Sequence, residues 1–285
     1  MAPQVIVFDE SKHSRHRVLS VGGIVFDLAD LQAIEADWLA ARWSAGIPAD
    51  AALKYSMSWP EGPDQRSHLI ETIARLPVRA LISLLEDFRP LRMKAPGKAT
   101  RKDSYIQCKA LEYALQRLAG DLYVSPADAG PHLVMIDDRD DFAQFKKVYV
   151  DGHRDGWPHL PHHPMPPLSE RGFSASLGAC SNGPLHEIAD LLVSCTTRWA
   201  DERCMNHKGG KAPDLEELDR CMSQLVRLFP AGQGGLPPRR CGHSVVVHAG
   251  NRTGKELLRD NVDRWMNDLT SGGGSASDPR TEIPF

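Results

Sequence analysis

Residues 4–26, QVIVFDESKHSRHRVLSVGGIVF, contain two stretches of β-branched and aromatic residues. The first stretch covers residues 4–8, the second covers residues 17–26, and a polar hexapeptide lies between them. Two such stretches joined by a short polar segment predict a β-hairpin. Gly22 and Gly23 lie inside the second stretch, where glycine usually marks a bulge or a close approach by another backbone. We therefore expect the fold to open with an antiparallel hairpin.

Downstream of the hairpin, helical and strand patterns alternate. Apolar residues spaced three and four apart predict helices, and compact β-branched runs predict strands. The expected helices cover residues 28–43, 64–76, 103–118, 142–149, 184–199, 215–229 and 254–269. The expected strands cover residues 78–88, 132–136 and 173–180, and a further β-branched run covers residues 244–248. This alternation predicts an α/β fold with a mixed sheet, helices on both faces and extra helices toward the C-terminal end.

The length of 285 residues, 41% of them hydrophobic, allows one large domain or a core domain with an appended smaller unit. We expect residues 1–203 to form the core domain and residues 204–270 to form a helical extension packed on that core. Residues 271–285 begin with a Gly- and Ser-rich run of the kind found in flexible linkers, which predicts a disordered tail.

Charge and sequence composition exclude several classes of protein. The chain has 34 Lys and Arg against 37 Asp and Glu, a net charge of -3, so a basic coat over the whole surface is excluded. No apolar run reaches the roughly 18 residues that a membrane span needs, so we expect no membrane partner. The N-terminal apolar run meets Asp9 without a basic leader, and the six cysteines contain no Cys-x-x-Cys pair. These features predict a cytoplasmic protein with free thiols.

Three aspartates occupy positions that are informative about function. Asp9 closes the first expected strand, Asp137 closes the strand at 132–136, and Asp190 lies inside an apolar helix. A buried carboxylate is costly unless it is paired or bound to a metal. Capping of the following helix explains Asp137 alone but does not explain Asp190 in mid-helix. Because Mg²⁺ and Mn²⁺ prefer oxygen ligands, we expect the three aspartates to converge on one or two such ions.

Five short segments occur in an order that resembles a known family. They are VFDES, SVGGIVF, ALKYS, VMIDD and EIADLL. In order and spacing, over about residues 4–200, they resemble the family numbered 3800 among the domains of unknown function. The resemblance implies a ribonuclease H-like fold and a metal-dependent nuclease. It also implies that Asp9, Asp137 and Asp190 hold the metals, with Glu10 and Lys54 beside them.

Two residues inside these segments, Glu187 and Lys54, are candidates for particular roles in the site. Glu187 stands three residues before Asp190, where the family often has a glutamine, and it is a candidate fourth metal ligand. His186 and Asp190 are four residues apart, so all three side chains can share one helix face. The alternative for Glu187 is an exposed helix residue. Lys54 is a candidate for neutralising a phosphate or holding the attacking water, and its alternative is a surface lysine with a buried stem.

A basic segment follows the strand at 78–88 and is suited to a phosphate backbone. Its residues are Arg89, Arg92, Lys94, Lys98, Arg101 and Lys102. The alternative is a solvated loop. Together with the carboxylates, the segment predicts an enzyme that hydrolyses phosphodiester bonds of RNA or DNA by two-metal chemistry. The competing hypothesis is a non-catalytic module of a defence or mobile-element system, which binds nucleic acid, a protein partner or a second copy of itself.

Overall fold

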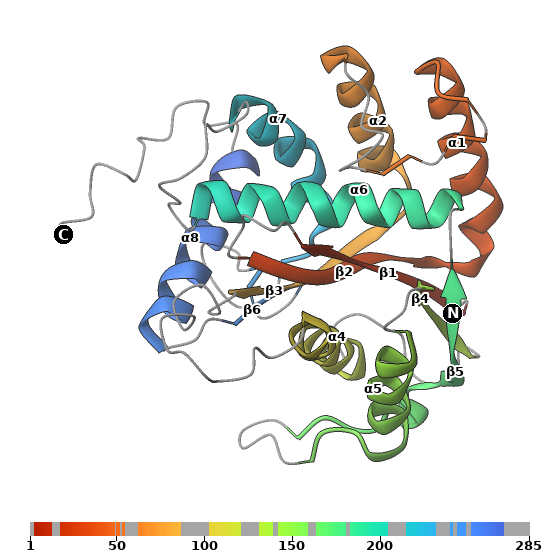
Figure 1. The fold of residues 1–285 in the computed structure, drawn as a ribbon, viewed down its shortest axis with the longest axis vertical. Coiled ribbons are helices and arrows are strands. Elements are labelled where there is room, and N and C mark those ends of the chain that lie inside the picture. Colours follow the sequence, from red (N-terminus) through yellow and green to blue (C-terminus); the bar gives the residue numbers. More distant parts are fainter. Residues whose placement is uncertain are drawn as a thin grey trace.

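The fold is built around a six-stranded sheet with helices on both faces (Figure 1). It is described here from a computed structural model of the chain. The structure describes residues 3–12, 18–48, 50–51, 53–54, 62–86, 103–120, 131–138, 142–158, 164–180, 183–204, 215–231, 240–241, 244–248 and 252–270.

The sheet is mixed, as the sequence predicted. Its strands are β1 (Gln4–Lys12), β2 (Val18–Asp27), β3 (Arg79–Glu86), β4 (His132–Asp137), β5 (Phe173–Cys180) and β6 (Val245–His248), in the order β5-β4-β1-β2-β3-β6. β2 runs antiparallel to both β1 and β3, which confirms the hairpin. β4 is parallel to β1, β5 is parallel to β4, and β6 is parallel to β3.

The first strand is longer than the sequence indicated. The expectation that Asp9 closes it was wrong, because pairing with β2 continues as far as Lys12, which lies opposite Leu19. The neighbouring strand β4 is shorter, and its register with β1 pairs Phe8 with Ile136. Asp9 therefore lies at the point where β4 ends beside a β1 strand that continues.

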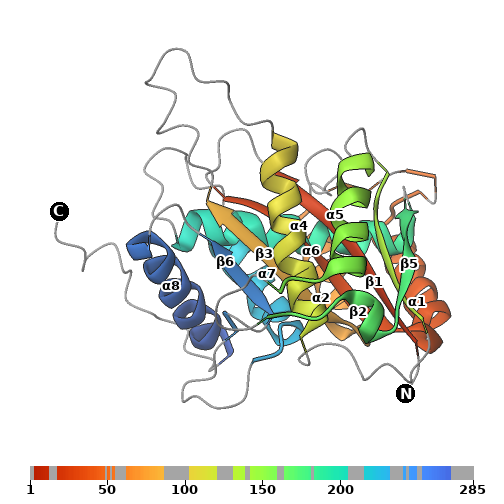
Figure 2. The same cartoon turned by 90° about the horizontal axis from the view of Figure 1, so that it is seen from below.

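Helices cover the two faces of the sheet unequally. They are α1 (Leu31–Ser44), α2 (Pro63–Arg75), α4 (Asp103–Ala119), α5 (Phe142–Asp155), α6 (Pro184–Trp199), α7 (Leu215–Leu225) and α8 (Arg252–Thr270). Shorter helical turns cover Leu28–Asp30, Leu168–Arg171, Ala200–Cys204 and Val226–Leu228. In Figure 1, α6 lies along β1 and β2 with α1, α2 and α7 beyond it, whereas α4 and α5 lie across the other face, as Figure 2 shows from below.

Strand alternation sorts the core into two hydrophobic clusters, one on each face of the sheet. In β1, Val5 and Val7 belong to the cluster on the α6 face, whereas Ile6 and Phe8 belong to the cluster under α4 and α5. Continuing this alternation places the side chain of Asp9 on the α6 face. The side chain of Glu10 accordingly lies on the opposite face.

The glycine pair in β2 reflects a close approach between strands. A Cβ atom on Gly23 would lie 1.8 Å from the carbonyl oxygen of Val7 in β1. The pairing of β1 with β2 is continuous through both glycines, so no bulge interrupts it. Of the two explanations that the sequence allowed, the structure supports the close approach.

The C-terminal residues contribute a strand as well as helices. β6 pairs with β3 at one edge of the sheet, and Met222 of α7 and Trp265 of α8 pack in the same core cluster as α6. Cys108, Cys180, Cys195, Cys221 and Cys241 are free thiols, as expected. None of the helices that the structure describes is both long enough and apolar enough to cross a bilayer. The expected disordered tail, 271–285, lies outside the described residues.

Candidate metal centre

Two aspartates lie side by side on the neighbouring parallel strands β1 and β4. Phe8 pairs with Ile136, so the next residues, Asp9 and Asp137, are adjacent at the point where β4 ends and β1 continues to Lys12. Helix α6 begins above this end of the sheet, with Gly183 as its N-cap and Pro184 in its first turn. His186 lies in that first turn. The sheet register and the start of α6 thus bring three potential metal ligands together.

The three side chains form a compact and buried group. One potential ligand atom from each of Asp9, Asp137 and His186 lies within 4.8 Å of the other two. His186 Nε2 is 3.8 Å from Asp137 Oδ1. The exposed fractions are 1% for Asp9, 5% for Asp137 and 2% for His186. The backbone N–H of Glu10 donates a 2.8 Å hydrogen bond to Asp9 Oδ1, which fixes the orientation of that carboxylate.

The donor set fits a divalent cation. An ion bonded to each donor at about 2.0–2.2 Å holds two donors at most about 4.4 Å apart, so the group needs to contract by only a few tenths of an ångström. Two buried carboxylates this close repel each other, and a bound cation offsets that repulsion. Oxygen donors suit Mg²⁺ and Mn²⁺, and the imidazole also suits softer transition ions.

Asp190 lies one turn further along α6 and is half-buried. Its Oδ1 accepts a 3.0 Å hydrogen bond from the hydroxyl of Ser194, and that hydroxyl lies 3.2 Å from the hydroxyl of Ser11 in β1. Asp190 therefore lies over the part of β1 that extends beyond β4. Among the described residues it is not part of the group formed by Asp9, Asp137 and His186.

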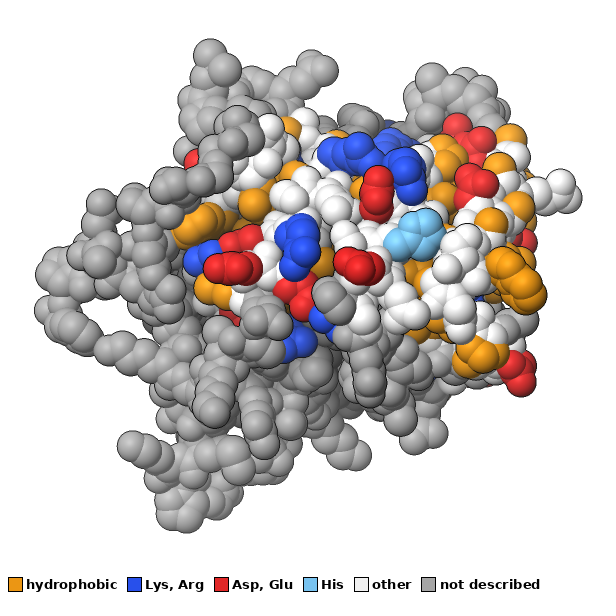
Figure 3. All heavy atoms as spheres, turned by 90° about the horizontal axis from the view of Figure 1, so that it is seen from above, with side chains coloured by type: hydrophobic (Ala, Val, Ile, Leu, Met, Phe, Trp, Pro, Cys, Tyr) orange, Lys and Arg blue, Asp and Glu red, His pale blue; other side chains and the backbone are white. Residues whose placement is uncertain are grey.

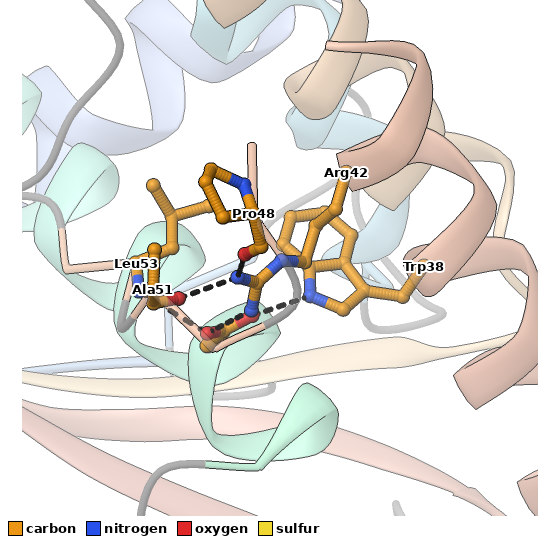
Figure 4. A network of polar contacts seen from close by, with 6 residues as sticks. Trp38, Arg42, Pro48, Ala51 and Leu53 are labelled. Carbon is orange, nitrogen blue, oxygen red and sulfur yellow. Dashed lines mark hydrogen bonds and ion pairs between the residues drawn. The ribbon is translucent and has the colours of Figure 1, made fainter. Parts of the chain in front are cut away.

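Glu187 is bonded to side chains of α1, and Figure 4 shows its partners Trp38, Arg42 and Leu53. Its Oε2 accepts a 2.8 Å hydrogen bond from Trp38 Nε1, and its Oε1 accepts one of 3.1 Å from the backbone N–H of Leu53. Arg42 Nη1 forms an ion pair with the same Oε1. Only 3% of Glu187 is exposed, so the alternative of an exposed helix residue was wrong. Both carboxylate oxygens are engaged by protein donors, which differs from the expected role as a metal ligand.

The same network fixes the segment that carries Lys54. Arg42 Nη2 donates to the carbonyl oxygen of Pro48, at 2.6 Å, and to that of Ala51. Together with the bond from Leu53 to Glu187, these contacts tie Pro48, Ala51 and Leu53 to α1 and to the first turn of α6. Lys54 follows directly and is half-buried.

Two more side chains lie near the carboxylates. Glu10 is 5% exposed, and strand alternation places it on the face of the sheet opposite α6, so its expected position beside the metal does not coincide with the three donors. Cys180 ends β5 directly opposite Asp137. Burial, followed by the negative charges of Asp137, Asp9 and Glu10, raises the pKa of the Cys180 thiol to about 12.

The predicted basic segment lies outside the described residues. This applies to all six of its members, Arg89, Arg92, Lys94, Lys98, Arg101 and Lys102. Figure 3 views the molecule from the side of α1, α2 and α7, where the described basic and acidic side chains are interspersed. On this face the described residues do not form one continuous basic surface.

Sequence reasoning did not select His186 as a ligand or Arg42 as a partner of Glu187. The signal for Arg42 is its position on α1, because Ile34, Trp38 and Arg42 recur every four residues on the buried side of the helix. An arginine on a core-facing stripe requires a buried acceptor. The signal for His186 is weaker, since one histidine at the start of an apolar helix is also typical of a packed core residue.

Comparison of the chain with family models, with curated proteins and with solved structures gives no match.

Proposed function

We propose that the chain is a metal-dependent nuclease that hydrolyses phosphodiester bonds of RNA or DNA. The observation that carries this proposal is the buried group of Asp9, Asp137 and His186, whose donor atoms lie within 4.8 Å of one another. Mg²⁺ or Mn²⁺ is the proposed cofactor, because two of the three donors are carboxylates. Asp190 lies one turn further along α6, where its carboxylate is a candidate ligand for a second ion.

The arrangement of the sheet supports the ribonuclease H-like assignment that the sequence resemblance implies. β1, β2 and β3 form an antiparallel meander, and β4 and β5 extend it in parallel with β1. The candidate ligands lie at the ends of β1 and β4 and on the helix that follows β5. Because a fold hosts many functions, the proposal rests on the site rather than on the topology.

The protein residues have separable roles in the proposed reaction. Asp9, Asp137 and His186 would hold a divalent ion, which when bound would supply the Lewis-acid chemistry that activates water and stabilises the leaving oxygen. Asp9 and Asp137 hold the positive charge in place, and their burial limits competition from bulk water. Lys54 is held at the end of the segment tied to Glu187, and we assign it to neutralising a phosphate oxygen of the substrate.

The test is single-turnover cleavage of labelled single- and double-stranded RNA and DNA, with Mn²⁺, with Mg²⁺ and with chelator. The wild-type chain should cleave at least one substrate only when metal is present. Asp9→Asn and Asp137→Asn should lose cleavage while keeping the fold, because an amide preserves the shape but not the charge that holds the ion. Asp151→Asn, at an exposed position of α5, is the matched control and should cleave as wild type does.

Two outcomes would contradict the proposal. Full cleavage by Asp137→Asn would remove the site from the reaction. Binding of nucleic acid by the wild-type chain without cleavage of any substrate would favour the non-catalytic module instead.

A further inference from the structure

We infer that His186 is a direct metal ligand, and that its imidazole makes the centre select a first-row transition ion, such as Mn²⁺, Co²⁺ or Zn²⁺, over Mg²⁺. The identity of the ion rests on the proposed metal centre, but it does not depend on which reaction the centre catalyses. The ion class follows from where His186 is held, from its distance to Asp137 and from the burial of all three donors.

His186 is held rigidly over the ends of β1 and β4. The next residue, Glu187, anchors the first turn of α6 to α1 through Trp38 and Arg42. Further along the helix, the hydroxyl of Thr197 is hydrogen-bonded to that of Ser20 in β2. Helix α6 is thus tied to α1 and to β2, and only 2% of His186 is exposed, so its ring faces the protein interior.

The distance between His186 and Asp137 fits a shared ion better than a direct hydrogen bond. A charge-assisted N–H···O bond is about 2.7–2.9 Å long, whereas Nε2 and Oδ1 are 3.8 Å apart. Two donors that bind one ion at about 2.0–2.2 Å are separated by about 3–4.4 Å, depending on the angle between them. The observed separation lies inside that range.

The donor chemistry and the burial both disfavour Mg²⁺ in this centre. Imidazole suits transition ions, whereas Mg²⁺ is found with carboxylate, carbonyl and water ligands. Mg²⁺ also dehydrates reluctantly and usually keeps several waters. Asp9, Asp137 and His186 are each at most 5% exposed, so the three donors face the protein interior rather than bulk water. A transition ion that accepts nitrogen and sheds water more readily therefore binds more tightly.

The experiment measures binding rather than activity. Mn²⁺ is added to the full chain, and the nitrogen hyperfine coupling of the bound ion is recorded by electron spin-echo spectroscopy. We expect an imidazole coupling that changes when the wild-type chain is labelled with [¹⁵N]histidine, which needs no substitution and so no assumption about folding. His186→Gln should lose the coupling. His153→Gln, on α5, is the matched control and should keep it.

A competition titration tests the selectivity. Mg²⁺ is titrated against bound Mn²⁺, with folding of each variant checked by circular dichroism. Replacing the imidazole by a carboxylate in His186→Asp should lower the ratio of Mn²⁺ to Mg²⁺ affinity, because the nitrogen donor that disfavours Mg²⁺ is removed. Bound Mn²⁺ without a histidine coupling, displacement by an equal concentration of Mg²⁺, or the absence of Mn²⁺ binding would each overturn the inference.

The same measurements separate this inference from the proposed function. Histidine-coupled Mn²⁺ on a chain that cleaves no nucleic acid would uphold the ligand assignment and refute the nuclease. Cleavage supported by Mg²⁺ alone, with no histidine coupling to bound Mn²⁺, would uphold the nuclease and refute the ligand assignment.

Discussion

The buried contact between Glu187 and Arg42 allows a quantitative prediction about stability. The change is Glu187→Gln, which keeps the size of the side chain but removes its charge and one of its two acceptor oxygens. Glu187 accepts hydrogen bonds from Trp38, Arg42 and the backbone of Leu53, and its side chain is only 4% exposed. The amide cannot satisfy all three donors.

Two costs set the size of the effect. If one of these buried N–H donors faces the amide N–H₂ group of the glutamine, it has no acceptor, and the loss lowers the free energy of unfolding by about 1–3 kcal/mol. Removing one partner of a buried ion pair costs about 3–5 kcal/mol, because the remaining charge is uncompensated. Arg42 keeps the carbonyl oxygens of Pro48 and Ala51, so we expect the lower end of that range. Adding the lower ends of both ranges, we expect the unfolding free energy to fall by about 4 kcal/mol, which leaves a typical domain folded.

The measurement is urea unfolding followed by far-ultraviolet circular dichroism. The midpoint should fall while the slope stays the same, since the surface exposed on unfolding does not change. Glu71→Gln is the matched control, because Glu71 pairs with Arg75 on the surface of α2, where the side chains are 51% and 58% exposed. That variant should change stability by about 0.5 kcal/mol or less.

A second variant tests the physical reason. Arg42→Met combined with Glu187→Gln should recover part of the loss, because the double variant buries no unpaired charge. If Glu187→Gln is no less stable than Glu71→Gln, the buried carboxylate does not anchor the first turn of α6, and the reasoning fails.

Three further predictions concern other parts of the molecule. Mn²⁺ at about 100 times its dissociation constant should stabilise the wild-type chain by about 2.7 kcal/mol in calorimetry, and Asp137→Asn should show little of this gain; an unchanged wild-type melting temperature would count against ion binding. Gly23→Ala should cost more than the about 1–3 kcal/mol of an ordinary overpacked site, since its Cβ would meet the Val7 carbonyl oxygen; an unchanged urea midpoint would contradict the β1–β2 register. Burial raises the pKa of the Tyr149 phenol, so as pH rises above about 10 the phenol ionises in the unfolded chain first and the stability of the wild-type chain should fall. Urea unfolding of Tyr149→Phe should show a smaller loss of stability over the same pH range. An equal loss in both chains would exclude Tyr149 as the cause.

The parts of the fold that the sequence predicted depend on local patterns. The hairpin follows from two β-branched stretches with a polar segment between them, and the existence of helix α6 follows from its apolar spacing. Asp137 was recognised because it directly follows a buried strand and occurs together with Asp190, whose position inside a helix is not explained by capping. Asp9 was recognised for the same reason, although β1 extends past it. Parallel pairing of β1 with β4 then places the two carboxylates together.

The parts that were not predicted depend on contacts between distant segments. The partner of Glu187 is Arg42, 145 residues away, so no local pattern shows which way the carboxylate turns. On a helix, residues 186 and 187 point about 100° apart. The carboxylate expected at the metal and the imidazole found there are therefore neighbours in sequence. Helix periodicity does not determine which of the two faces the metal site, because nearly every position of α6 is buried.

The pairing of β3 with β6 has a consequence for synthesis of the chain. Ile82 pairs with Val245, and about 160 residues separate them, which a ribosome translating about 5–20 residues per second takes roughly 8–30 s to cover. During that time the apolar strand β3 presents an open edge, and such edges template intermolecular pairing. The nascent chain is therefore most vulnerable to aggregation before β6 emerges, and holding by a chaperone would matter most in that interval.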